Sequence, residues 1–182
     1  MKIFEAIDAR MTEWIEAQHM FFVATAPLAA DGHLNLSPKG LDSFRILGPR
    51  EIAYVDLTGS GAETIAHLRE NGRIVVMFCA FEGPPRIVRL HGRGVAVVPG
   101  DPDYDALVAR FPAILGTRAV IRIALDRIAD SCGYAIPLLA YQGERDQLTA
   151  WAAHKGPDGL RAYRAEWNTK SIDGLPSLET DS

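Results

Sequence analysis

The chain has 182 residues, of which 48% are hydrophobic and 23% are charged, and its formal net charge is -4. This length suits one well-buried domain, and the composition excludes wholesale disorder. Because acids are in excess and no long basic run is present, we expect no binding to nucleic acid or to an anionic membrane surface.

The first segment has apolar residues every three or four positions, at 3, 4, 7, 11, 14 and 15. This spacing predicts an amphipathic helix within residues 1–18. Acids between the apolar positions, and the lack of a basic start, are unlike a signal peptide. No apolar stretch approaches the roughly 20 residues needed to span a bilayer. We therefore expect a cytoplasmic protein without a membrane partner.

Short runs of strand-forming residues follow, separated by turns. The expected strands are residues 21–25, 33–37, 43–47, 51–57, 73–81, 86–98 and 119–125. Asp31-Gly32 is a hairpin turn, and Gly92 and Gly94 inside a strand indicate a bulge. Because adjacent hairpins have few helices between them, the pattern predicts a mainly β protein, an antiparallel barrel with flanking helices that is closed or partly open.

Helical segments are expected after the turn at residues 59–61, at residues 101–110 with Asp101 as the cap, and in the tail from 144 to 168, broken at Gly156-Pro157. We interpret residues 1–182 as a single domain. Its parts are an N-terminal helix (1–18), a barrel core (19–127) and a helical C-terminal tail (128–182).

The turn Gly59-Ser60-Gly61 lies between a strand and a helix, a place where proteins often bind phosphate. A dinucleotide fold needs a small residue where Thr64 stands, and a P-loop needs a lysine that this turn lacks. Two interpretations remain. The free backbone N–H groups and the hydroxyls of Ser60 and Thr64 bind a phosphate, or Ser60 only caps the helix.

Metal and thiol chemistry are not expected. Cys79 and Cys132 have no CxxC spacing, and the five histidines have no metal-ligand spacing. We interpret Cys132 as a small buried residue and His67 as a surface residue.

Four segments, in this order, resemble the pyridoxamine 5'-phosphate oxidase-like family of FMN-binding split barrels. They are Asn35-Leu-Ser-Pro-Lys-Gly40, Tyr54-Val-Asp-Leu-Thr-Gly-Ser60, Asn71-Gly-Arg-Ile74 and Pro85-Arg-Ile-Val-Arg-Leu-His-Gly-Arg93. The resemblance covers residues 21–127. It implies a six-stranded antiparallel Greek-key split barrel that forms a homodimer, with FMN bound at the subunit interface.

The resemblance also implies which residues bind FMN. Lys39 would bind its phosphate, Tyr54 and Val55 would lie along the flavin, and Arg89 would add positive charge. The helix N-terminus adds Ser60 and Thr64 as phosphate donors, and Ser37 and Asp56, in the same two matching segments, complete the expected set. The family's oxidases carry an Arg-Lys pair near the start of the helix, where this chain has residues 61–64. Glu63 among them would repel a phosphate if it pointed inward.

The implied function is that of an FMN-dependent oxidoreductase. Pyridoxamine 5'-phosphate is not the expected substrate, because residues 171–177 replace the arginine-containing signature that contacts it in the family. No catalytic residue stands out. The alternative is a non-catalytic split barrel that binds flavin or haem for storage or sensing. The retained Lys39 favours the enzyme, and the missing basic pair favours the alternative.

Overall fold

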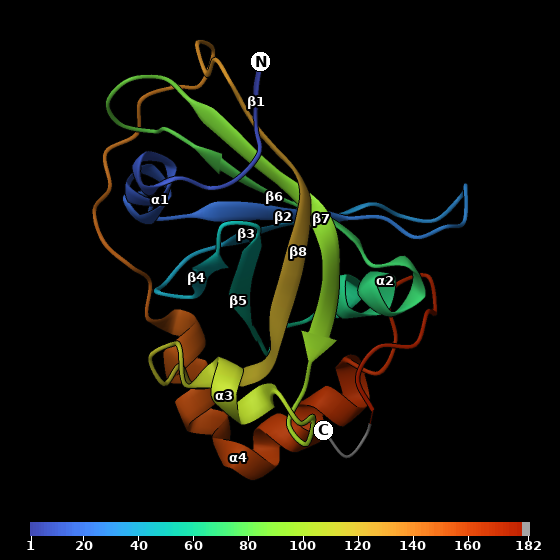
Figure 1. The fold of residues 1–182 in the computed structure, drawn as a ribbon. Coiled ribbons are helices and arrows are strands. Elements are labelled where there is room, and N and C mark those ends of the chain that lie inside the picture. Colours follow the sequence, from blue (N-terminus) through green and yellow to red (C-terminus); the bar gives the residue numbers. More distant parts are fainter. Residues whose placement is uncertain (180–182) are drawn as a thin grey trace.

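A computed structural model describes residues 1–179 of the chain (Figure 1). Its centre is one antiparallel sheet in which the strands follow the order β3-β2-β6-β7-β8-β5-β4, with β1 paired to β8. The strands are β1 (Lys2–Phe4), β2 (Phe21–Thr25), β3 (Asn35–Lys39), β4 (Phe44–Gly48), β5 (Glu51–Leu57), β6 (Arg73–Cys79), β7 (Ile87–Val97) and β8 (Thr117–Ser131).

Four helices flank this sheet within the described residues. They are α1 (Ala9–Glu16), α2 (Glu63–Asn71), α3 (Tyr104–Val108) and α4 (Gln147–Trp167). In Figure 1, α1 lies to the left and α2 to the right of β8, both contribute to the same core, and α3 and α4 lie together at one end. Gly156 bends α4 with a φ of 64°, as the Gly156-Pro157 break predicted. No helix within residues 1–179 combines the length and the apolar character needed to cross a membrane.

The sheet curves but does not close. β3 and β4 are the two ends of the strand order, although they follow one another in sequence. This arrangement confirms the mainly β, split-barrel class that the sequence predicted. The strand count is eight in one sheet instead of six. One of the additional strands is β1, whose residues pair with Asp130, Ala129 and Ile128 of β8.

A bulge interrupts the pairing of β7 with β8. The register shifts between His91 and Gly92, next to the glycines that predicted a bulge, but the extra residue is Asp126 of β8, because His91 pairs with Arg127 and Gly92 with Leu125. A Cβ atom on Gly92 would lie 2.2 Å from the carbonyl oxygen of Ala124. Only glycine therefore lets the two backbones approach this closely.

Strand alternation divides the apolar residues into two cores. The larger core lies on the concave side and includes Phe21, Tyr54 and Phe78. The ring centroid of Phe21 lies 5.6 Å from that of Tyr54 and 5.5 Å from that of Phe78. The smaller core lies on the other face, where Val55 packs with α3 residues such as Leu107. Successive residues of β5 thus point into different cores.

Three local predictions were wrong. Residues 2–4 form a strand instead of the start of a helix, and α1 begins only at Ala9, where Asp8 Oδ1 accepts a hydrogen bond from the Met11 N–H at 2.7 Å. Asp101 does not cap α3, because its carboxylate accepts from the N–H of Val98 and the helix starts at Tyr104.

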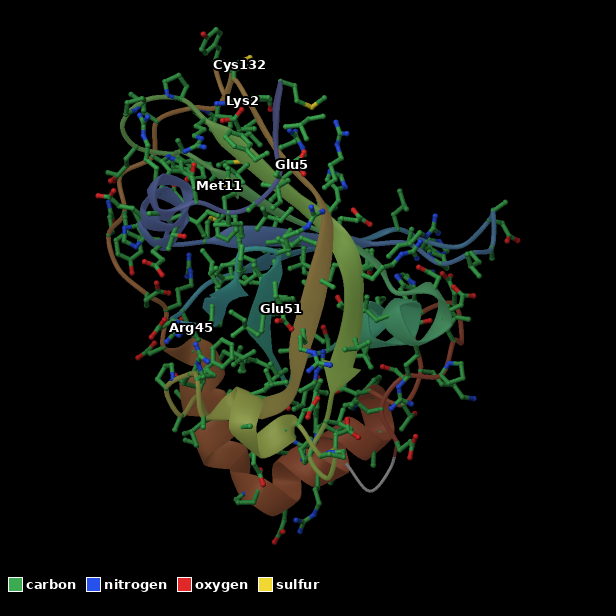
Figure 2. The ribbon with its side chains drawn as sticks, viewed as in Figure 1. Lys2, Glu5, Met11, Arg45, Glu51 and Cys132 are labelled. Atoms are coloured by element: carbon green, nitrogen blue, oxygen red, sulfur yellow. The ribbon has the colours of Figure 1, made fainter. Side chains whose placement is uncertain are left out.

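The third concerns Cys132, which is exposed instead of buried. It follows β8 directly, at the end of the molecule far from α4 (Figure 2). Because β8 extends to Ser131, this thiol projects beyond the sheet and its core.

Candidate ligand-binding site

Edge strand β3 contacts the end of β5 and the start of α2 through its side chains. Alternate residues of β3, Asn35, Ser37 and Lys39, are half-buried, whereas Leu36 and Pro38 between them are exposed. The half-buried side chains therefore line the inner side of the edge strand. We call this line of contact between β3, the end of β5 and the start of α2 the seam.

A buried carboxylate bridges the seam. Lys39 Nζ lies 3.2 Å from Asp56 Oδ1, and Arg118 Nε lies 2.7 Å from Asp56 Oδ2. Asp56 is fully buried. Burial alone would raise the pKa of Asp56, but the charges of Arg118 and Lys39 outweigh it and lower that pKa below its ordinary value. One ionised carboxylate thus serves two cations.

A second polar cluster lies further along β3. Asn35 Nδ2 donates to Thr64 Oγ1 at 2.9 Å and to Thr25 Oγ1 at 3.1 Å, and Ser37 Oγ donates to Asn35 Oδ1 at 3.1 Å. Thr64 is buried. Its hydroxyl therefore joins α2 to β3, in addition to any contact with a ligand.

His67 belongs to this cluster and is buried, so the prediction that it lies on the surface was wrong. The helix α2 contacts β2, β6 and β7, which covers this side of the helix. His67 Nδ1 is 2.9 Å from Thr25 Oγ1, and Nε2 has no hydrogen-bond partner in the described part of the chain. Burial lowers the pKa of His67 below its usual value, so the neutral imidazole is favoured.

The turn before α2 is held by the C-terminal tail. Asn168 Nδ2 donates to the carbonyl of Gly59, and Ser177 Oγ donates to the carbonyl of Ala62, both at 2.9 Å. Ala62 is the N-cap residue and supplies no side-chain hydrogen bond. The interpretation of Ser60 as the cap was therefore wrong: Ser60 is exposed and lies two residues earlier.

Glu63 lies between the turn and the tail. Its Oε1 accepts a hydrogen bond from the N–H of Ile172 at 3.3 Å, and its Oε2 lies against Gly61, only 2.2 Å from where a Cβ atom on that glycine would be. The carboxylate therefore contacts both the tail and the turn. The backbone N–H groups in the first turn of any α-helix have no carbonyl within the helix to bond to. In α2 these groups are the donors that a bound anion would meet.

Arg118 connects the carboxylate bridge to this turn. Its Nη2 donates to the carbonyl of Gly61 at 2.7 Å, and the residue is 5% exposed. Within residues 1–179, its Nη1 has no hydrogen-bond partner, and neither has the buried Nε of Arg164 on α4. Burial and then the charge of Arg118 lower the pKa of Arg164. The positive charge around the turn is therefore only partly balanced.

The structure brings together part of the predicted set. Ser37, Lys39, Asp56 and Thr64 line the seam, and Ser60 lies at its end. Of the remaining predicted residues, Tyr54 lies behind the seam in the main core, and Val55 and Arg89 lie elsewhere.

The side chains of Tyr54 and Val55 are buried in the two opposite cores. Burial and then the charge of Asp56 raise the pKa of Tyr54 well above its usual value, while Thr64 and Arg118 act to lower it, so the Tyr54 hydroxyl lies near the polar groups of the seam from the core side. Arg89 lies on β7, with β2 and β6 between it and β3, and its Nη1 donates to Ser131 Oγ.

Sequence reasoning missed Asn35, Arg118 and Asn168. The two-residue alternation that links Ser37 and Lys39 also selects Asn35, so a strand pattern could have found it. Arg118 lies at the start of β8, and no sequence motif surrounds it. Asn168 reaches Gly59 across 109 positions of sequence, and no local pattern marks such a contact.

Comparison with known proteins identifies the family of the chain. The family model described as pyridoxamine 5'-phosphate oxidase matches residues 7–132. The pyridoxamine 5'-phosphate oxidase family protein ustO of Aspergillus flavus is 40% identical over 194 residues, which cover 97% of this chain and 78% of that protein. The chain belongs to the pyridoxamine 5'-phosphate oxidase family.

Solved structures show the fold of this family. HupZ of Group A Streptococcus superposes with a TM-score of 0.52 at 24% identity, over 68% of this chain and 93% of that one. A Lactobacillus delbrueckii protein assigned to pyridoxamine 5'-phosphate oxidase gives 0.54 at 14% identity, over 71% and 99%. Both likenesses concern the fold alone.

Proposed function

We propose that this member of the pyridoxamine 5'-phosphate oxidase family is an FMN-binding oxidoreductase whose seam holds the flavin and whose turn at residues 59–61 holds the FMN phosphate. The observation that carries the proposal is the bridge of Lys39, Asp56 and Arg118. It places two cations beside a helix N-terminus and balances them with one carboxylate. A phosphate is the kind of group that such a donor set favours.

The missing basic pair and Glu63 both bear on this binding. One oxygen of Glu63 accepts from the N–H of Ile172, whereas the other lies against Gly61, so the carboxylate has to move off the turn when a phosphate binds there. Arg118 has one nitrogen without a partner among the described residues and already contacts the turn through Gly61. In the oxidases of this family an Arg-Lys pair binds the FMN phosphate. We assign this role here to Arg118, Lys39 and the N–H groups of the first turn of α2.

Bound FMN would supply the electron chemistry, and the chain would supply binding and orientation. Lys39 is the residue best placed for this role, since it is partly accessible while its charge is fixed by Asp56. Asn35, through Thr64, holds α2 against β3 and so keeps the turn at the end of the seam.

The test is the dependence of binding on the phosphate. FMN and riboflavin are titrated into the purified protein, with quenching of flavin fluorescence as the measurement. We expect FMN to bind at least about tenfold more tightly than riboflavin, the size of one charge-assisted hydrogen bond. Lys39→Gln should weaken FMN and leave riboflavin almost unchanged, and Lys155→Gln on the exposed side of α4 is the matched control. A protein that takes up neither flavin refutes the proposal.

A non-catalytic flavin- or haem-binding protein is the second candidate. It is favoured by the fact that Asp56 and Thr64 both make contacts within the protein. Such groups serve structure and are not free to exchange protons with a substrate. Bleaching of the 450 nm flavin band (roughly its usual position) by NADH or NADPH under anaerobic conditions separates the two: an oxidoreductase is reduced, whereas a storage or sensing protein keeps its oxidised spectrum.

A further inference from the structure

A cavity of about 480 Å³ opens at the end of the barrel near α1. It lies between the end of α1, the start of β2, the loop that follows Lys39 and the tail near Glu144. None of the groups assigned to the FMN phosphate lines it. Its volume falls within the range of small-molecule sites, roughly 300–1,000 Å³.

Aromatic side chains form the floor of the cavity. Phe21, Phe44 and Phe78 line it, and their ring centroids are 5.0 to 5.5 Å apart. These rings offer no hydrogen-bonding group. The floor therefore fits an apolar or aromatic part of a ligand.

The rim is acidic. Glu16, Asp42 and Glu144 line it together with one cation, Arg45. Both terminal nitrogens of Arg45 bond to the carboxylate of Asp42, and its Nε donates to the carbonyl of Arg110 at 2.9 Å. Figure 2 shows Arg45 beside β4, at the side of the molecule that faces α3 and α4. With Arg45 and Asp42 paired, Glu16 and Glu144 leave the rim with two unbalanced negative charges.

Glu144 is held in place and is not a loose surface carboxylate. Its Oε1 accepts from the Tyr141 hydroxyl at 2.9 Å, and its Oε2 accepts from the N–H of Leu41 at 3.3 Å. Tyr141 stacks on His19, a residue of the cavity wall, with ring centroids 3.6 Å apart and planes inclined by 8°. The tail segment is thereby fixed across the mouth of the cavity.

Leu41 adds a second sign of a built site. It has a φ of 61°, and it is the one non-glycine residue with positive φ in residues 1–179. A branched side chain is strained in this conformation, and such strain is concentrated at functional sites. The strained residue forms part of the cavity wall and donates to Glu144.

We propose that this cavity binds a small organic cation, an ammonium or guanidinium group carried on an aromatic or branched aliphatic body. The body packs on the phenylalanine floor, and the cationic group lies between Glu16 and Glu144. The same rim repels a phosphorylated ligand, so the cavity does not suit pyridoxamine 5'-phosphate. The inference goes beyond flavin binding and does not depend on it.

Three probes of similar shape and different charge test the proposal by calorimetry at pH 7 and low salt: 2-phenylethylamine, 2-phenylethanol and 3-phenylpropionate. The amine should bind at least about tenfold more tightly than the alcohol, which corresponds to about 1.4 kcal/mol, and the carboxylate should not bind. Raising the salt concentration should weaken the amine alone. Equal affinity for amine and alcohol, or no binding of any probe, overturns the proposal.

Variants locate the charge. Glu16→Gln and Glu144→Gln should each weaken the amine by about threefold to tenfold, as expected for a partly exposed charge pair, and leave the alcohol unchanged. Glu13→Gln, on the exposed side of the same helix α1 and outside the cavity, is the matched control. Glu144 also accepts a hydrogen bond from the N–H of Leu41, so its replacement can alter the loop that follows Lys39. In that case the Glu16 variant decides the test. A loss as large in the Glu13 variant contradicts the assignment.

Discussion

At the scale of single residues, the seam depends most on the carboxylate of Asp56. It is fully buried, and its two oxygens are divided between Lys39 and Arg118. Removing one partner of a buried ion pair leaves a charge without compensation. The stability of the seam and the position of both proposed phosphate ligands therefore depend on one carboxylate.

Asp56→Asn should lower the free energy of unfolding by about 3–5 kcal/mol, because the buried Arg118 loses its counter-charge. Urea denaturation followed by circular dichroism measures this change. Asp42→Asn, which removes an exposed ion pair with Arg45, should cost no more than about 1 kcal/mol. If both variants lose the same small amount, Asp56 does not have the role given to it.

His67 should make stability depend on pH. Burial lowers its pKa in the folded protein below the usual 6.5, so on acidification the unfolded chain takes up the proton first. The contribution of His67 to stability is therefore fully present above the unfolded pKa of 6.5. It is lost as the pH falls from there toward the lower pKa of the folded protein, by up to about 1.4 kcal/mol per pH unit for one proton.

Urea midpoints between about pH 5 and pH 7.5 measure the slope, and His67→Gln should reduce it. His91, whose pKa burial also lowers, leaves part of the slope in place. The exposed His33 acts in the opposite direction, because its hydrogen bond with Asp173 raises its pKa. An unchanged slope in the His67 variant would show that another group controls the effect.

At the scale of elements, the tail is part of the fold that positions the site. Asn168 and Ser177 bond to the turn before α2, and Leu178 is buried in the main core. This tail segment thus covers the start of α2 and joins it to the barrel. Its contribution can be separated from that of α4 by mutation within the tail alone.

Leu178→Ala should lower the free energy of unfolding by about 2–5 kcal/mol, the range for a buried leucine. Ile172→Ala in the same tail should change it by no more than about 0.5 kcal/mol, since Ile172 is 69% exposed. Chemical denaturation measures both variants. Equal effects would show that the tail does not pack on the core in solution.

Sequence reasoning predicted elements whose signals are local. β2 was predicted within its observed bounds because its residues are strong strand formers between clear breaks. The strand at Lys2–Phe4 was missed because its apolar spacing also fits a helix, and its pairing with residues 128–130 is distant in sequence. The same reason explains the site: Lys39 could be predicted from a motif, but its ion pair with Asp56 and the role of Arg118 depend on how strands far apart in sequence meet.

At the scale of the whole molecule, the two open edges of the sheet need protection. β3 is an edge strand, and the outer side chain of Leu36 is 66% exposed, with Leu34 just before the strand 80% exposed. Exposed apolar edge strands pair with other chains unless they are covered. A second copy of the chain is the partner that the family resemblance implies.

We predict a homodimer that uses this edge. Sedimentation velocity should give twice the mass of one chain, and Leu36→Glu should shift the protein toward the monomer. Ile172→Glu places the same charge on another exposed apolar residue and should leave the mass unchanged. A wild-type protein that sediments as a monomer at micromolar concentration would contradict the prediction.

The position of β8 also determines how the chain can fold during its synthesis. β8 runs from Thr117 to Ser131 and pairs with β1, β5 and β7, all of which leave the ribosome before it. Until β8 emerges, β5 and β7 each have an unpaired edge, and the first residues of the chain have no strand to join. Such edges are sites of association between nascent chains. The protein should therefore be most vulnerable to aggregation late in translation, just before the strand that completes its sheet becomes available.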